Sequence, residues 1–243
     1  MRVNSTDFQN AVGRYLALAQ KEDVIITKNG KSVAKLVAYT QPDFFINEST
    51  GEYRVVRRIS YEEYMDYVSS SDQRYELIDG EVYLLASPSF RHQVIVREVL
   101  LQLCNYLGEN SPCQALTAPL DAHLHGYATK FSEDPNVVQP DIVVICDPEK
   151  VTAHGKYEGI PTLVVEVLSP STRSKDLVTK LSLYMRSGIA EYWVVDPDNK
   201  TVWQYAFTPD RDIHASKMHA HPEALQSSVF PELTLSLAKI FTQ

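Results

Sequence analysis

The segment Leu163-Val164-Val165-Glu166-Val167-Leu168 constrains the fold most strongly, because it places one carboxylate among five apolar residues. An extended run that is apolar on both faces is typical of a central strand covered on each side of its sheet. An unpaired carboxylate is costly there, so Glu166 must be protonated, paired with a cation or bound to a metal. The segment therefore predicts a covered sheet that contains a buried acid.

Two further charged residues are predicted to lie near Glu166. Asp141 follows Pro140 at the start of the apolar stretch of a strand expected over residues 137–146. Lys180 belongs to a helix expected over residues 175–186, where it lies about 60° from Leu177 on the apolar stripe. This helix connects a strand at 161–168 to one at 191–195, which is a β-α-β crossover. The sequence thus predicts an α/β domain with a mixed sheet flanked by helices.

Two carboxylates and an ammonium group beside a sheet indicate metal-assisted chemistry on phosphodiesters. Asp141 and Glu166 would bind a hard divalent cation, Mg²⁺ or Mn²⁺. Lys180 would orient the attacking water or neutralise developing charge. Glu76, on the first strand of a predicted hairpin, would add a further acidic group.

Each of these residues also has a plainer interpretation. Glu166 and Lys180 are also consistent with a buried structural ion pair without metal, which is the less favoured interpretation. Asp141 is consistent with a cap at a strand end, and Glu76 with a solvated hairpin carboxylate. His92, near a helix start, would either approach a phosphate or be a partly buried helix-terminal histidine.

The elements around this cluster follow from local signals. Ser60 and Glu63 form a capping box for a helix at 61–68. Asp79-Gly80 predicts a hairpin between strands 75–78 and 81–85. A largely buried helix is expected at 91–107, and further strands at 115–124 and 201–207, the last as an edge strand.

The first 42 residues differ in charge from the rest of the chain. They hold six basic and three acidic side chains, a net charge of +3, whereas the whole chain of 243 residues carries −8, which leaves −11 for the remainder. A helix from Ser5 or Thr6 to Gln20 and a hairpin around Asn29-Gly30 are predicted. Because so small a unit buries little core, we expect it to dimerise or to pack on the remainder of the chain.

Composition excludes several classes of protein and sets the expected compartment. No apolar run approaches the roughly 18 residues of a membrane span, and the N-terminus lacks the apolar core of a signal peptide. A cytoplasmic location is therefore expected. Cys104, Cys113 and Cys146 are widely spaced and are expected to be reduced and mostly buried.

Residues 61–207 closely resemble the Uma-type family of restriction endonuclease-like proteins, within the PD-(D/E)XK superfamily. The segments that carry the resemblance are 75–81, 140–144, 165–172 and 191–197, together with Asp176 and Lys180. The resemblance matches Pro140-Asp141 and Glu166 to the two acids of the superfamily. The superfamily lysine usually follows two residues after the second acid, where this chain has Leu168, but the resembling family supplies it from the next helix, where Lys180 lies.

The first 40 residues are similar to antitoxins of the Phd/YefM type, through segments 1–8, 24–31 and 33–37. The similarity implies a dimerising domain that binds operator DNA through a basic N-terminal surface. By this resemblance the phosphate-facing residues would be Arg2, Asn4, Ser5, Arg14 and Lys28. Antitoxins of this type wrap a toxin with a C-terminal tail, whose place is taken here by the nuclease-like module.

Together these observations predict an antitoxin-like domain at 1–42, a linker at 43–58, a restriction endonuclease-like domain at 59–210 and a C-terminal extension at 211–243. The protein is expected to be a DNA endonuclease that depends on Mg²⁺ or Mn²⁺. Its expected catalytic residues are Asp141, Glu166, Lys180 and Glu76. The expected partners are DNA and a second copy of the chain, with a toxin as a further candidate. The alternative is a catalytically inactive DNA-binding regulator or antitoxin-like protein that uses the nuclease fold as a scaffold.

Overall fold

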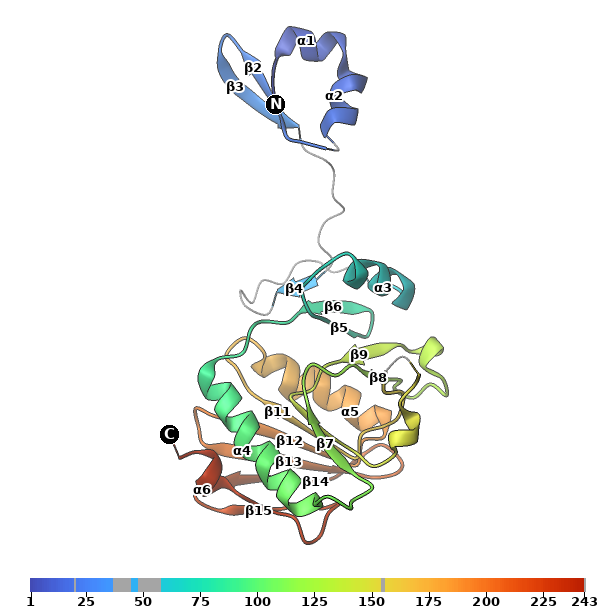
Figure 1. The fold of residues 1–243 in the computed structure, drawn as a ribbon, viewed down its shortest axis with the longest axis vertical. Coiled ribbons are helices and arrows are strands. Elements are labelled where there is room, and N and C mark those ends of the chain that lie inside the picture. Colours follow the sequence, from blue (N-terminus) through green and yellow to red (C-terminus); the bar gives the residue numbers. More distant parts are fainter. Residues whose placement is uncertain (20, 37–44, 48–57, 154–155, 243) are drawn as a thin grey trace. The chain divides into compact units, whose positions relative to one another are not determined.

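A computed structural model describes residues 1–19, 21–36, 45–47, 58–153 and 156–242. The chain forms two compact units, Met1–Asp43 and Phe44–Gln243 (Figure 1). The division falls one residue after the predicted end of the first domain. Most of the predicted linker, residues 43–58, lies outside the described residues.

The first unit is a three-stranded sheet with two short helices. Its elements are β1 (Arg2–Asn4), α1 (Ser5–Asn10), α2 (Val12–Ala19), β2 (Val24–Lys28) and β3 (Lys31–Leu36), with strand order β1-β2-β3. The prediction of one helix capped by Ser5 or Thr6 is wrong: Asn4 is the N-cap, and the chain leaves helical geometry at Ala11. The Asn29-Gly30 turn is confirmed, since both residues have positive φ, as a type I′ turn requires.

The second unit is built on a six-stranded mixed sheet. Its strand order is β14-β13-β12-β11-β10-β7. These strands are β7 (Gln114–Thr117), β10 (Ile142–Ile145), β11 (Leu163–Val167), β12 (Glu191–Asp196), β13 (Thr201–Phe207) and β14 (Ile213–Ala220). Strands β11 and β12 pair in parallel, which confirms the predicted β-α-β crossover.

A five-stranded sheet accompanies it, with order β4-β6-β5-β9-β8. Its members are β4 (Phe45–Asn47), β5 (Tyr75–Ile78), β6 (Glu81–Leu84), β8 (Ala122–Leu124) and β9 (Asn136–Val138). The strands predicted at 115–124 and 137–146 are each divided between the two sheets. Pro119 and Pro140 lie at the two breaks, where a residue without an N–H cannot continue a ladder.

Helices cover both faces of the six-stranded sheet. The α- and π-helices described in this unit are α3 (Tyr61–Ser69), with the predicted Ser60–Glu63 capping box, α4 (Phe90–Leu107), the π-helical turn Lys175–Lys180, α5 (Leu181–Ser187) and α6 (Leu237–Ile240). Leu163, Val165 and Val167 pack with α4 on one face, whereas Val164 packs with α5 on the other. Because side chains alternate along a strand, Glu166 belongs to the α5 face.

Residues 211–243 are part of this domain and not an extension of it. Strand β14 pairs along β13, so β13 is an internal strand and not the predicted edge. The segments β15 (Ala224–Gln226), β16 (Thr234–Ser236) and α6 complete the core beneath α4. The predicted boundary at residue 210 therefore cuts through a single core.

The cysteine prediction is wrong. Cys113 and Cys146 are joined by a disulfide, and Cys104 is free and exposed. The paired residues directly precede β7 and follow β10, which are neighbouring antiparallel strands, so the register places them opposite one another.

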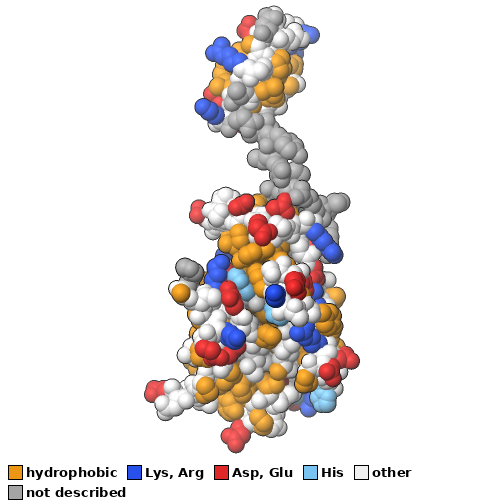
Figure 2. Space-filling view, turned by 90° about the vertical axis from the view of Figure 1, so that its right-hand side faces the viewer, with side chains coloured by type: hydrophobic (Ala, Val, Ile, Leu, Met, Phe, Trp, Pro, Cys, Tyr) orange, Lys and Arg blue, Asp and Glu red, His pale blue; other side chains and the backbone are white. Residues whose placement is uncertain are grey.

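On the face of the second unit seen in Figure 2, acidic and basic side chains are interspersed with apolar ones. The excess negative charge therefore forms no single patch on this face. Among the described residues, no helix is long and apolar enough to span a bilayer.

Candidate active site

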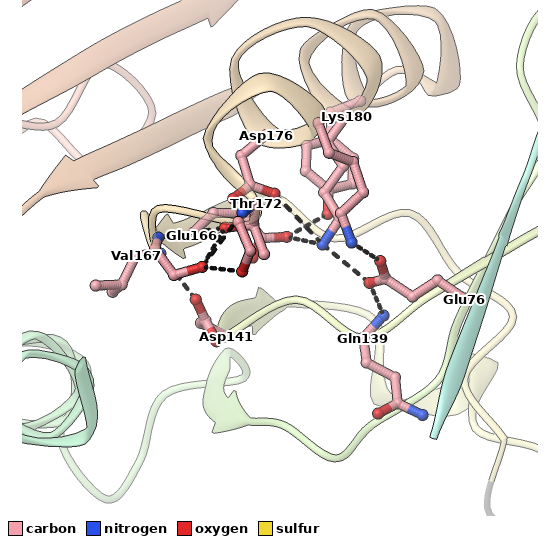
Figure 3. A network of polar contacts seen from close by, with 12 residues as sticks. Glu76, Gln139, Asp141, Glu166, Val167, Thr172, Asp176 and Lys180 are labelled. Atoms are coloured by element: carbon pink, nitrogen blue, oxygen red, sulfur yellow. Dashed lines mark hydrogen bonds and ion pairs between the residues drawn. The ribbon is translucent and has the colours of Figure 1, made fainter. Parts of the chain in front are cut away.

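Strand pairing brings the two predicted metal-binding acids together. In the antiparallel ladder of β10 and β11, Ile142 lies opposite Val165 and Val143 opposite Val164. Continuing this register by one residue places Asp141 opposite Glu166. Directly opposed residues in such a ladder have Cβ atoms about 5 Å apart. The two acids thus become neighbours although 25 residues separate them in sequence (Figure 3).

Asp141 is held through one of its two oxygens. Its Oδ2 accepts hydrogen bonds from the backbone N–H of Val167, at 2.8 Å, and from Nε2 of His92, at 3.1 Å. Burial disfavours a charged imidazole, but the hydrogen bond to Asp141 outweighs it and raises the pKa of His92. Within the described part of the chain, Asp141 Oδ1 has no hydrogen-bond partner. The carboxylate is therefore fixed in direction while one oxygen stays available.

Glu166 is arranged in the same way on the α5 side. Its Oε1 accepts from Lys180 Nζ at 2.8 Å and from the Tyr184 hydroxyl at 2.7 Å. No described residue forms a hydrogen bond with Oε2. Figure 3 shows Lys180 reaching down from its helix between Glu166 and Glu76. The structure thus brings together Asp141, Glu166, Lys180 and Glu76, the four residues expected from the sequence.

Glu76 is fully buried, so its interpretation as a solvated hairpin carboxylate is wrong. Its Oε1 accepts from the backbone N–H of Gln139 and lies 2.9 Å from Lys180 Nζ, while Oε2 lies 2.6 Å from Lys175 Nζ. Both oxygens are therefore occupied by donors. Glu76 acts as a clamp on two lysines in this structure.

A π-helical turn over Lys175–Lys180 is what allows both lysines to reach Glu76. In an α-helix, residues five apart point roughly 140° away from each other, because each residue turns the helix by about 100°. A π turn has i→i+5 hydrogen bonds and brings such residues to one face. Lys175 was missed from the sequence because α-helical spacing was expected there.

The cluster around Glu166 has more carboxylates than basic groups. Among the described residues, Glu76, Asp141, Glu166 and Asp176 face three basic groups, the ammonium groups of Lys175 and Lys180 and the imidazole of His92. Burial and the neighbouring carboxylates raise the pKa of Glu166 to about 8 despite Lys180. Burial likewise raises the pKa of Asp176 to about 6 against the two lysines, and the surrounding acids raise the pKa of Lys180 against its burial. The cluster is therefore short of positive charge.

A cavity of about 330 Å³ opens onto this cluster and is lined by Asp141, Glu166, Asp176, Lys175 and Lys180. Among the described residues, no three His, Cys, Asp or Glu side chains are arranged to hold a metal ion. Mg²⁺, however, is usually held by one or two carboxylates together with water and substrate phosphate. Two carboxylates with an available oxygen each, beside a cavity and short of positive charge, suit that ion.

The residues predicted to contact DNA lie in the first unit. Arg2, Asn4, Arg14 and Lys28 are exposed, and Ser5 is half-buried. Asn4 and Ser5 are engaged in the cap of α1, since Asn4 Oδ1 accepts from Thr6 N. The first unit therefore presents three exposed cations from this set.

Comparison with known proteins agrees with the fold. Residues 61–238 match the model of the Uma2 family, described as putative restriction endonucleases. The chain belongs to the Uma2 family. The uncharacterized protein slr1290 of Synechocystis sp. (strain ATCC 27184 / PCC 6803 / Kazusa) is 30% identical over 158 residues, which span 64% of this chain and 77% of that protein.

A solved structure shares the Uma2 architecture. It is a putative nuclease belonging to DUF820 from Anabaena variabilis ATCC 29413, with a TM-score of 0.61 and 20% identity over 76% of this chain and 98% of that chain. The predicted α/β restriction endonuclease-like core is thereby confirmed. The Uma2 match also extends well beyond residue 210, in agreement with the C-terminal strands of the core.

The candidate site contains residues that were not assigned from the sequence. Lys175 contacts Glu76, and Tyr184 contacts Glu166. His92, for which the sequence left two interpretations, contacts Asp141. Lys175 and Tyr184 lie five before and four after Lys180, so a search for polar groups on its helix face, allowing a π turn, would have found them. His92 carried no such signal, because its contact with Asp141 spans 49 residues.

The clamp at Glu76 predicts an acid-sensitive contribution to stability in this Uma2 chain. Burial opposes ionisation of Glu76, but Lys175 and Lys180 outweigh it and lower its pKa from 4.5 to about 2. Between those two values the unfolded chain binds more protons than the folded one, so acid destabilises the fold. The contribution is present above about pH 4.5 and is lost as pH falls towards 2, by about 3 kcal/mol. Urea unfolding across this range should show a flatter pH dependence for Glu76→Gln than for wild type, and parallel curves would contradict the clamp.

Proposed function

We propose that this Uma2 chain hydrolyses DNA phosphodiester bonds with Mg²⁺ or Mn²⁺ as cofactor. The observation that supports this most directly is the opposed pair of Asp141 and Glu166, which lines a cavity beside the buried cation Lys180. The available oxygens of the two acids, Asp141 Oδ1 and Glu166 Oε2, would hold the ion. A bound divalent cation supplies Lewis-acid polarisation of a phosphoryl oxygen and activation of water.

The protein side chains have distinct tasks in this proposal. Val167 N–H and His92 orient Asp141, and Tyr184 orients Glu166. The raised pKa of Lys180 keeps it protonated, so it acts as a hydrogen-bond donor and a neutralising charge and not as a general base. It can therefore orient the water or stabilise negative charge that develops on the phosphate.

Glu76 is the accessory acidic residue of the proposed site. Its low pKa keeps it ionised, so it donates no proton to the reaction at neutral pH. We assign it the task of positioning Lys180 and Lys175 at the cavity. This assignment follows from the contacts of its two oxygens.

The first unit is proposed as an antitoxin-like, dimerising DNA-binding module. Its net positive charge and the exposed Arg2, Arg14 and Lys28 support this role. It would hold DNA near a second unit whose own charge is negative. A toxin partner and a cytoplasmic location stay predictions.

The proposal is tested by cleavage of supercoiled plasmid DNA in Mg²⁺ and in Mn²⁺. Wild type is expected to nick or cut, whereas Asp141→Ala and Glu166→Ala should lose at least about a hundredfold in rate, because each removes half of the ion's protein ligands. The isosteric variants Asp141→Asn and Glu166→Gln should fall similarly while keeping the neighbouring packing.

Glu191→Gln is the matched control for a buried glutamate. Glu191 is fully buried on β12, but its partners are neutral donors such as Trp193 Nε1 and Ser227 Oγ, and it does not line the cavity. This variant should cut like wild type. Equal cutting by wild type and the Asp141 and Glu166 variants would refute the assignment. Salt-sensitive DNA binding without cutting and without a metal-dependent thermal shift would instead identify the inactive regulator.

A further inference from the structure

Arg74 lines the same cavity as Asp141 and Glu166 but takes no part in the ion-pair cluster of the described residues. It precedes β5, and its carbonyl accepts from the N–H of Leu85, so it continues the hairpin by one pair. Because Arg74 lies two residues before Glu76, the strand places both side chains on the same face. Arg74 is therefore held at the cavity wall by the same hairpin that carries Glu76, the residue that clamps the two lysines.

Arg74 is half-buried, and its guanidinium has neither an ion pair nor a hydrogen bond to any residue that the structure describes. The other cations that line the cavity are engaged: Lys175 with Glu76, Lys180 with two carboxylates, and His92 with Asp141. Outside the cavity, Arg173 of the same unit is likewise paired with an acid, Asp196. Arg74 is thus a positive charge that faces the cavity without a counterion in the described chain.

Guanidinium groups bind phosphate oxygens through two parallel N–H donors. We propose that Arg74 anchors a backbone phosphate of the nucleic acid substrate, next to the phosphate that lies at Asp141 and Glu166. The inference rests on the proposed function for its substrate class. It assigns Arg74 to binding and not to the chemical step.

The test measures binding of a short fluorescein-labelled DNA duplex to the full chain in EDTA, at several KCl concentrations. Arg74→Ala should weaken binding about tenfold, through loss of a charge-assisted hydrogen-bond pair. It should also reduce the slope of log Kd against log salt by about 0.9, the value for one phosphate contact. Arg74→Lys should keep the slope and bind several-fold more weakly than wild type, because it loses the bidentate geometry.

Lys217→Ala is the control for the loss of one positive charge. Lys217 is exposed on β14, three strands from β11 in the sheet order, and should bind DNA like wild type. Circular dichroism of each variant verifies folding. Identical affinity and slope for Arg74→Ala and wild type would overturn the inference, as would a wild type that binds DNA without salt dependence.

Cleavage separates this inference from the proposed function. If the protein cuts DNA, Arg74→Ala should raise KM about tenfold and leave kcat within about twofold, the signature of lost uniform binding. An unchanged KM would overturn the proposed role of Arg74 without contradicting the proposed nuclease activity. If DNA binding depends on Arg74 but the protein does not cleave DNA, the phosphate-binding role of Arg74 is supported and the proposed nuclease activity is refuted.

Discussion

Deletion of residues 211–243 is expected to leave the second unit without a cooperative fold. The deleted segment supplies six deeply buried side chains to the core beneath α4: Leu225, Leu233, Leu235, Leu237, Ile240 and Phe241. Burial of side chains of this size contributes about 1.5–3 kcal/mol each. Their combined contribution is on the order of the 5–15 kcal/mol by which whole domains are stable. The deletion also removes β14 and exposes the hydrogen-bonding edge of β13.

Urea unfolding followed by circular dichroism measures this effect. The shortened chain should lack a sigmoidal transition from the second unit and should bind a hydrophobic dye such as ANS. Deletion of residues 1–43 is the control, because the core of the first unit is formed by its own residues, including Val3, Tyr15 and Val24. The midpoint of the second unit should then be unchanged. A normal transition after loss of 211–243 would show that this segment is an extension after all.

Replacement of Lys180 by methionine is expected to lower the free energy of unfolding by about 3–5 kcal/mol at neutral pH. Lys180 is almost fully buried and contacts both Glu76 and Glu166. Without it, Glu166 keeps only the Tyr184 hydroxyl as a donor among the described residues, and Glu76 keeps one lysine in place of two. Buried negative charge is left uncompensated. Cleavage should fall with the same substitution, since the neutralising cation is lost.

A double variant distinguishes loss of charge balance from loss of packing. At pH 9, above the pKa of about 8 of Glu166, Lys180→Met combined with Glu166→Gln removes one charge of each sign and should recover part of the lost stability in a double-mutant cycle. Lys217→Met removes an exposed lysine and should change stability by less than about 0.5 kcal/mol. If Lys180→Met is as stable as Lys217→Met, the cluster contributes nothing to folding and the ion-pair account is wrong.

The candidate site residues were recognisable from the sequence because they are charged side chains in segments whose apolar pattern predicts burial. Glu166 stands inside a run that must be covered on both faces, and Asp141 opens the neighbouring apolar strand. Local signals also predicted the capping box at Ser60 and the Asp79-Gly80 turn, in which both residues have positive φ. These features depend on short-range sterics and hydrogen bonding, which a few adjacent residues specify.

Features that depend on contacts between distant segments were decided by the tertiary structure. Glu76 lies in a hairpin that is locally indistinguishable from a solvated one, and it is buried by segments far away in the sequence, which contribute Gln139, Lys175 and Lys180. The two strands expected at 115–124 and 137–146 were divided because a second sheet takes half of each. The C-terminal segment joined the core because β13 had an open edge to pair with.

The sequence by itself determined that this chain folds around a covered sheet with acids at its centre and a lysine on the following helix. Only the tertiary structure decided which of these charged residues contact one another. The register of β10 and β11 opposes Asp141 to Glu166, and the π turn brings Lys175 and Lys180 to one carboxylate. Both depend on long-range packing, because strand register and helix pitch are selected by what they bury.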